Sequence, residues 1–216
     1  MTDPETLDAL DPVQLRVLAC LVEKEGTTPE AYPLTENALV LACNQKTGRD
    51  PVMNLTPGQV GHALRTLEDR GLVRSVHGAR AQRWEHRFAQ HYSLTRAQQA
   101  LLAVLALRGP QTVSELTSRT ERLARFADAE ELRHALERLA AHAPAYAVNL
   151  GRGAGQREDR WMHLLGGPVD TSLLAAAREA PAAGGRAALE QRVDGLEAEV
   201  AELRETLAGL LARLEG

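Results

Sequence analysis

An internal repeat constrains the fold of this 216-residue chain more than any other feature of its sequence. Three pairs of segments align: 10–21 with 94–105, 62–67 with 134–139, and Arg83-Trp84 with Arg160-Trp161. The offsets are 84, 72 and 77 residues, so the first copy carries about twelve extra residues before its third helix. Such self-similarity predicts that one module occurs twice along the chain.

Each copy is predicted to contain three helices. The first helices begin at capping boxes, Asp11 with Gln14 and Thr95 with Gln98, which satisfy backbone N–H groups at a helix start. The second helices are placed at 35–44 and 112–120, and the third begin at Thr56 and Asp128. The third helices carry an apolar stripe at i, i+4, i+7 spacing, formed by Val60, Leu64 and Leu67 and by Leu132, Leu136 and Leu139.

Two short strands are predicted to follow the helices of each copy. They cover 72–77 and 82–88 in the first copy, and 146–150 and 160–165 in the second. Three helices followed by a β-hairpin is the order of a winged helix-turn-helix. The predicted fold class is therefore mainly α with small β-hairpin wings (α+β). Two tandem winged helix-turn-helix domains, at 10–92 and 93–165, follow a flexible N-terminus at 1–9.

The C-terminal part of the chain has a different composition. Residues 166–186 are rich in Gly, Ala and Pro and are predicted to form a linker. Residues 187–214 are predicted to form a coiled-coil helix, because their apolar positions alternate in spacings of four and three. This seam consists of Leu189, Val193, Leu196, Val200, Leu203, Leu207, Leu210 and Leu214. Valine at two a positions with leucine at every d position favours two strands, and the opposite charges of Arg192 with Glu197 and of Glu199 with Arg204 favour a parallel arrangement, so a parallel homodimer is expected.

Several motifs of the first copy resemble a known family. Leu21–Leu34 (LVEKEGTTPEAYPL), Ala42–Lys46 (ACNQK) and Arg49–Met53 (RDPVM) are similar to the YceH family of bacterial proteins. The resemblance extends over both modules and the C-terminal coiled coil. It implies winged-helix modules and a cytoplasmic location, and it implies no activity.

Composition and charge exclude several classes of protein. The net charge is −4 and the pI about 6.0, so no global basic field attracts nucleic acid or acidic membranes. Aromatic residues make up 3%, too few for a base-stacking platform that binds single strands. The N-terminus is acidic and the longest apolar run is the seven residues Leu101–Leu107, so we expect no signal peptide or membrane span, and a cytoplasmic location.

A winged helix usually contacts double-stranded DNA with its third helix and its hairpin. Arginine suits both guanine edges and phosphates. The candidate nucleic-acid contacts are His62, Arg65, Thr66, Arg74, Arg80 and Arg83 in the first copy and Arg133, His134, Arg138, Arg152, Arg157 and Arg160 in the second. The hairpin segment 71–92 holds four arginines and one glutamate, so positive charge is concentrated there. The alternative is that an arginine-rich chain distributes arginine over every solvated face.

The extra residues of the first copy include a polar connection, 44–54. A connection this long is more often functional than accidental. Its candidate residues for binding an anion or a partner's carboxylate are Asn44, Gln45, Lys46 and Arg49. The alternative is a self-satisfied network, with Asn44 and Gln45 capping carbonyls and Arg49 paired to Asp50.

No pattern in the sequence indicates catalysis. The seven histidines show no metal-ligand spacing, and neither a nucleophile elbow nor a phosphate-binding glycine loop occurs. Cys20 and Cys43 are expected to be buried small hydrophobic residues and cannot build a zinc site alone. We therefore expect no enzyme, no metal and no cofactor.

Two functions are compatible with these sequence features. The first is a DNA-binding regulator, dimerised through the tail, that contacts DNA with the third helices and the wings. The alternative is a protein–protein interaction scaffold without DNA binding, like the winged-helix pairs of chromosome-partition complexes. A continuous positive potential across the third helices would favour DNA, and a mixed or apolar surface would favour a protein partner.

Overall fold

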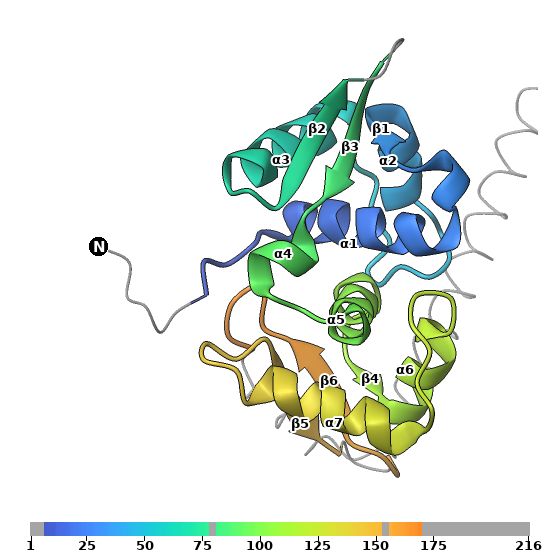
Figure 1. Cartoon of the computed structure of the whole chain (residues 1–216), viewed down its shortest axis with the longest axis vertical. Helices are drawn as coiled ribbons and strands as arrows, with labels where there is room; N and C mark the ends of the chain where they lie inside the picture. The colour runs from blue at the N-terminus through green and yellow to red at the C-terminus, as the bar shows by residue number, and fades with distance from the viewer. Residues whose placement is uncertain (1–6, 78–80, 153–155, 170–216) are drawn as a thin grey trace, which may run out of the picture. The chain divides into compact units, whose positions relative to one another are not determined.

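The computed structural model describes residues 7–77, 81–152 and 156–169. Within these ranges the chain is a mixed α+β protein with seven α-helices and two three-stranded sheets (Figure 1). The predicted coiled-coil helix at 187–214, the linker beyond Val169 and the hairpin residue Arg80 lie outside the described residues. Over the described part of the chain, every helix is too short or too polar to traverse a lipid bilayer.

The elements of the two copies follow the same order. The first copy comprises α1 (Pro12–Thr27), a short 3-10 turn η1 (Pro29–Ala31), β1 (Leu34–Thr35), α2 (Glu36–Cys43), α3 (Pro57–Asp69), β2 (Val73–His77) and β3 (Gln82–His86). A short helix, α4 (Phe88–Tyr92), leads to the second copy. This copy comprises α5 (Arg96–Arg108), β4 (Gln111–Thr112), α6 (Val113–Thr120), α7 (Ala129–Ala140), β5 (Ala147–Gly151) and β6 (Arg160–His163).

The helix starts follow from local capping, as the sequence predicts. Asp11 caps α1 and Thr95 caps α5, each in a complete capping box. Thr56 caps α3 and Asp128 caps α7, at the predicted starts of the third helices. Because a capping box joins residues only three apart, it can be identified before any tertiary contact is known.

The strands differ from the prediction in two respects. Each sheet has three strands, because β1 and β4 pair with the last strand of the hairpin in the orders β1-β3-β2 and β4-β6-β5. These two-residue strands carry no periodicity of their own. The predicted ends of the last strands were wrong: β3 ends at His86, with Phe88 beginning α4, and β6 ends at His163 rather than Leu165. Phe88 and Tyr92 are both buried, one helical turn apart, and their rings make an edge contact.

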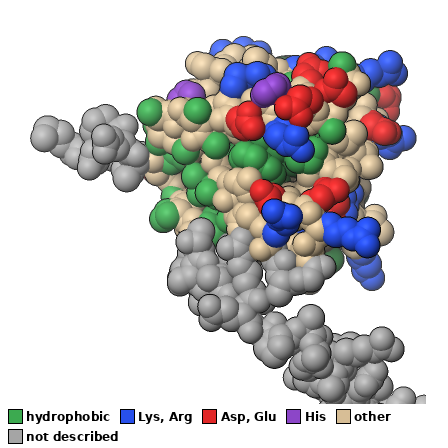
Figure 2. Space-filling model, turned by 90° about the horizontal axis from the view of Figure 1, so that it is seen from below, with side chains coloured by type: hydrophobic (Ala, Val, Ile, Leu, Met, Phe, Trp, Pro, Cys, Tyr) green, Lys and Arg blue, Asp and Glu red, His purple; other side chains and the backbone are tan. Residues whose placement is uncertain are grey.

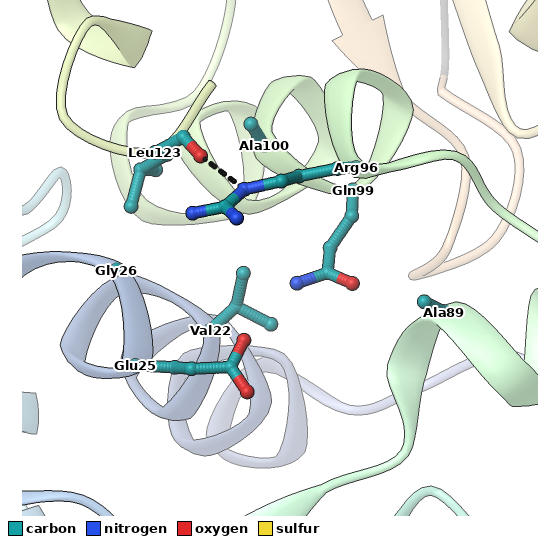
Figure 3. A pocket seen from close by; sticks show the side chains of 8 residues that line it. All are labelled: Val22, Glu25, Gly26, Ala89, Arg96, Gln99, Ala100 and Leu123. Carbon is teal, nitrogen blue, oxygen red and sulfur yellow. Dashed lines mark hydrogen bonds between the residues drawn. The ribbon is translucent and has the colours of Figure 1, made fainter. Parts of the chain in front are cut away.

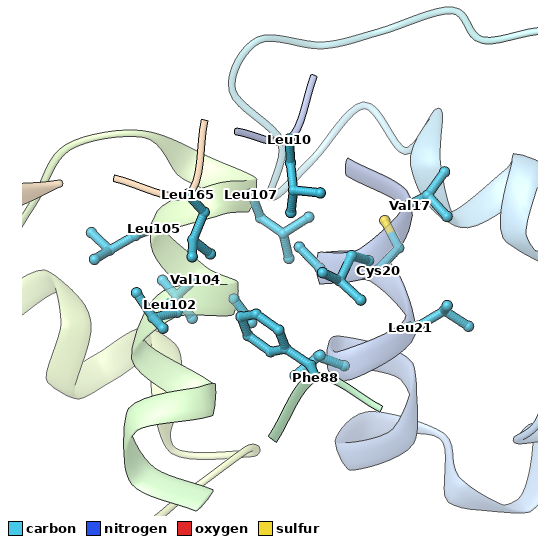
Figure 4. Close-up of a cluster of buried hydrophobic side chains, with 14 of the residues drawn as sticks. Leu10, Val17, Cys20, Leu21, Phe88, Leu102, Val104, Leu105, Leu107 and Leu165 are labelled. Carbon is cyan, nitrogen blue, oxygen red and sulfur yellow. The ribbon is translucent and has the colours of Figure 1, made fainter. Parts of the chain in front are cut away.

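The first helices of the two copies, α1 and α5, pack against each other at the centre of this unit (Figures 1 and 4). On their other sides α1 packs against α2 and α3, and α5 against α6 and α7. Residues 17–22 of α1 and 99–105 of α5 are consequently buried without interruption. A helix covered on all sides needs no polar stripe, which explains the uninterrupted apolar run Leu101–Leu107.

The ends of the repeat are also tied together. The Leu10 N–H donates to the Leu165 carbonyl at 2.8 Å, joining the start of the first copy to the end of the second. Leu10, Leu165 and Phe88 converge on the space between α1 and α5 in Figure 4. The two copies therefore share one hydrophobic core.

We predict that Leu102→Ala destabilises both copies together. Leu102 of α5 is 0% exposed, and such a truncation costs about 2 to 5 kcal/mol. Leu41→Ala is the matched control, because Leu41 is 73% exposed and its loss should change stability by less than about 0.5 kcal/mol. Urea unfolding followed separately by Trp84 and Trp161, in single-tryptophan variants, should give one coincident transition. Two separate transitions would contradict a shared core.

Candidate functional site

The exposed face of α7 carries charges of both signs that pair with each other. Arg133 Nη1 lies 2.7 Å from Glu130 Oε2, and the His134 ring lies 3.1 Å from Glu137 Oε2. Arg138 is exposed and has no ion-pair partner among the described residues. Figure 2 views the end of the unit that bears α7, and it shows acidic and basic side chains interspersed beside apolar ones. The predicted contacts on α7 therefore do not form a continuous positive surface.

The exposed face of α3 is nearly neutral. His62 and Arg65 are exposed as predicted, and Thr66 is half-buried, its hydroxyl donating to the His62 carbonyl at 3.2 Å. Asp69, one helical turn after Arg65, is exposed on the same side. Arg65 makes no ion pair within the described ranges.

The repeated Arg-Trp dipeptide has a structural explanation. Arg83 Nη1 donates to the Pro33 carbonyl at 2.7 Å, and Arg160 Nη1 donates to the Pro110 carbonyl at 2.9 Å. Each proline precedes the short strand β1 or β4, and in each copy the neighbouring buried tryptophan faces that strand. Arg83 and Arg160, predicted to contact nucleic acid, thus fasten the third strand to each hairpin. The repeated Arg-Trp dipeptide therefore corresponds to the same arginine–carbonyl contact in both copies.

The remaining hairpin arginines differ in their surroundings. Arg74 Nε donates to Glu85 Oε1 across the strands at 2.9 Å, and Arg152 Nε lies 3.4 Å from Asp159 Oδ1. Arg157 is exposed and has no ion-pair partner in the described part of the chain. Arg87, directly after β3, is likewise exposed without an ion pair there, so neighbouring carboxylates neutralise only part of the positive charge on the hairpins.

The polar connection is organised around Arg49, whose side chain is 1% exposed. All five of its N–H groups find acceptors: the Ala42 and Gly48 carbonyls, both Glu23 carboxylate oxygens (3.0 and 2.5 Å) and Gln45 Oε1. Its ionic partner is Glu23 of α1, so the suggested pairing with Asp50 is wrong. No donor of Arg49 is left for an external anion.

Of the other predicted residues of the connection, two are hydrogen-bonded within the chain and one is exposed to solvent. The Asn44 amide donates to the Leu55 carbonyl at 2.8 Å and accepts from the Leu55 N–H at 2.7 Å, which closes the connection on itself. Gln45 is engaged with Arg49. Lys46 is exposed and has no partner among the described residues. Of the four, only Lys46 remains available to a ligand.

A second buried arginine fixes the other end of the connection, and it is absent from the residues predicted on sequence grounds. Arg16 of α1 is 1% exposed, and it donates to the Cys43 carbonyl at 3.1 Å and to the Pro51 carbonyl at 2.7 Å. Burial lowers the pKa of its guanidinium. Arg16 and Glu23 lie seven residues apart, on one side of α1. The sequence did contain a signal for this site, because two charged residues seven apart interrupt an otherwise apolar helix.

The two cysteines lie beside this cluster. Cys20 and Cys43 are both buried, as predicted. The interaction with the Cys20 thiol and burial raise the pKa of Cys43. A buried thiol of raised pKa is a poor nucleophile, so Cys43 does not resemble a catalytic cysteine.

A polar pocket of about 420 Å³ lies between α1, α4 and α5 (Figure 3). Its charged side chains are engaged within the chain: Arg96 Nε donates to the Leu123 carbonyl at 3.0 Å, and Glu25 Oε2 lies 3.0 Å from His86 Nε2. The hydrogen bond with His86 lowers the pKa of the Glu25 carboxyl. In Figure 3, Gln99 extends into the space between these two charged groups.

Comparison with known proteins places these features in a family. Residues 10–156 match the family described as "Protein of unknown function, DUF480". The chain belongs to this family. It is 56% identical over 204 residues to a UPF0502 protein of Pseudomonas syringae, covering 93% of this chain and 91% of the relative.

Further bacterial relatives are similar over comparable lengths. A UPF0502 protein of Xanthomonas campestris is 53% identical over 220 residues, covering 100% of this chain and 98% of the relative. One of Mesorhizobium japonicum is 52% identical over 206 residues, covering 95% and 98%. The similarity therefore extends beyond the DUF480 match into the C-terminal tail.

We predict that Arg49 contributes to stability and Lys46 does not. Arg49→Met should cost about 3 to 5 kcal/mol, because it leaves the Glu23 carboxylate without its partner. Lys46→Ala, in the same connection, should change stability by less than about 0.5 kcal/mol. The double variant Glu23→Gln with Arg49→Met should recover part of the loss, as a double-mutant cycle in urea would measure. A loss below about 1 kcal/mol for Arg49→Met would contradict this assignment.

Proposed function

We propose that this protein is a protein–protein interaction scaffold built from two winged-helix modules. In each copy the third helix, α3 or α7, follows the second helix and precedes a β-hairpin. The short strand β1 or β4 completes a three-stranded sheet with that hairpin. This order of elements supports the assignment to winged helices, and it makes α3, α7 and the hairpins the surfaces to consider for binding.

The mixture of positive and negative charges on the α7 face is the observation that favours a protein partner over DNA. A surface that binds DNA needs unpaired cations to replace the counterions of the phosphates. On α7, Glu130 and Glu137 lie beside Arg133 and His134 and would repel phosphates. Mixed charges beside apolar groups suit a protein partner, because complementary charges fix orientation while apolar contacts supply free energy.

A DNA-binding regulator is the second candidate function. It is favoured by exposed arginines that make no ion pair among the described residues, among them Arg65, Arg87, Arg138 and Arg157. Four phosphate contacts would give a logarithmic salt slope of only about 4, against about 10 for a strong repressor. DNA binding on this basis would be weak and would be lost as salt is added.

We further propose that the protein is a cytoplasmic homodimer, in line with its resemblance to the YceH family. The dimer would form through the leucine and valine seam of residues 187–214. A dimer presents two copies of each α7 face. Two weak contacts would then act together, which raises the effective affinity for a repeated or dimeric partner.

We predict that photo-crosslinkers placed at Arg65 or His134 in cells capture a discrete protein. Both positions are exposed on third helices, and Glu30, exposed on η1, serves as the matched control that should give no adduct. Mass spectrometry identifies the captured chain. Mobility shifts with pooled genomic fragments at low salt should show no complex at micromolar protein. A shift that Arg65→Ala with Arg138→Ala abolishes, without protein adducts, would favour the DNA regulator instead.

We predict that Leu196→Arg with Leu203→Arg converts the full-length chain from dimer to monomer. Both leucines occupy d positions of the predicted seam, where a charge would be buried at the dimer interface. Glu202→Arg introduces the same side chain at an outer c position and should leave the dimer intact. Sedimentation equilibrium distinguishes the species, since the monomer mass is 23.5 kDa. A double variant that stays dimeric would place the dimer interface elsewhere.

A further inference from the structure

A second cavity lies between the two copies, near the N-terminal end of α1 and the C-terminal end of α5. Its volume is about 420 Å³, within the range of small-molecule sites. The polar connection of the first copy forms one wall, and β6 with the segment 166–169 forms another. Because both copies contribute, the site exists only in the packed repeat.

Most of the cavity wall is apolar. Leu15, Met53, Leu105, Ala106 and Met162 line it, together with prolines of both copies. Gly166 adds to the space, because a Cβ placed there would lie 3.0 Å from Leu15 Cδ1 and 3.9 Å from His163 Cε1. Such a wall favours a hydrocarbon group and disfavours a bare inorganic ion.

Arg16 supplies a buried positive charge to this wall. Two backbone carbonyls hold its guanidinium, but its Nε–H has no acceptor and no carboxylate lies within ion-pair distance among the described residues. An isolated buried cation is costly, so binding an anion here would recover free energy that the apo protein lacks. The two carbonyl contacts already fix the orientation of the guanidinium, which lowers the entropic cost of that binding.

His163 is a second buried polar group of the cavity without a complete set of partners. It is 6% exposed, and its Nδ1 has no hydrogen-bond partner within the described ranges. Burial lowers the pKa of His163 to about 4, so the ring is neutral at pH 7 and one of its nitrogens is a donor. Two orphaned polar atoms on one cavity wall are unusual in a native protein and need an explanation.

Asp50 is the group that opposes an anion here, because it also lines the cavity. Its side chain is exposed, so water and salt screen its charge, whereas the charge of Arg16 is buried and weakly screened. The site therefore still prefers an anion, although Asp50 lowers its affinity for one.

We propose that this cavity binds a small carboxylic acid, with its apolar body between Met53 and Met162 and its carboxylate at Arg16. Neither the interaction scaffold nor the DNA alternative requires such a site. The ligand would contact both copies at once and stabilise their packing. Its binding is independent of any partner, so its test does not depend on the proposed function.

Two methionines of the chain offer a direct test. Met53 and Met162 line the cavity. In full-length protein with isotope-labelled methionine methyl groups, hexanoate should shift the Met53 and Met162 signals saturably. Hexanol and hexylamine keep the apolar body and remove or reverse the charge, and they should bind at least about tenfold more weakly, since each loses a charge-assisted contact to Arg16.

Three variants make the outcome decisive. Ala106→Phe fills the cavity and should abolish the shifts, while Ala97→Phe, on the same helix outside the cavity, should retain them. Asp50→Asn should tighten hexanoate binding about two- to fivefold, because it removes an exposed like charge. Equal binding of hexanol, no saturable shift, or shifts that persist in Ala106→Phe would each overturn the proposal. The test does not require the substitution of the buried Arg16, which could unfold the protein and so abolish binding for an unrelated reason.

Discussion

The packing of α1 against α5 is the contact on which the rest of this structure depends. The central segments of both helices, 17–22 and 99–105, are buried on every side, because each helix supports its own copy on one face and the other copy on the opposite face. A small three-helix unit with a short sheet buries little apolar surface alone. By sharing one core, the two copies reach a size at which burial can exceed the entropy of ordering the chain. The repeat is thus a means of stability as well as a duplication.

The same helix α1 also organises the polar connection that distinguishes the first copy. Arg16 and Glu23 project from it into the otherwise apolar interior, one holding carbonyls and the other holding Arg49. Buried ions of this kind are costly unless they are paired or fully hydrogen-bonded. Arg49 meets that condition with five acceptors, and Arg16 does not, since its Nε is left without one among the described residues. The contrast between the two arginines distinguishes a structural cluster from a site that can gain from a ligand.

Several arginines of the described residues hold parts of the fold together. Arg83 and Arg160 attach short strands, Arg74 joins two strands through Glu85, and Arg49 closes the connection. These uses occupy cations that could otherwise contact phosphates. They also explain how an arginine-rich chain can present a third helix of mixed charge, which is the basis for favouring a protein partner.

The sequence alone determined the features of this protein that arise from residues close together in the chain. Capping boxes span three residues, so the starts of α1, α3, α5 and α7 followed from Asp11, Thr56, Thr95 and Asp128. The stripes on the third helices and the burial of both cysteines were equally readable. The roles of individual polar side chains were not, because their partners lie far away: Glu23 is 26 residues from Arg49, and Pro33 is 50 from Arg83. Only the tertiary structure showed which arginines are hydrogen-bonded or ion-paired within the chain and where β1 and β4 pair. It also showed that a cavity with two unpartnered polar atoms, Arg16 Nε and His163 Nδ1, lies between the copies. Local pattern sets where an element begins and which face it buries, whereas the partner of a buried charge depends on which distant segment folding brings beside it.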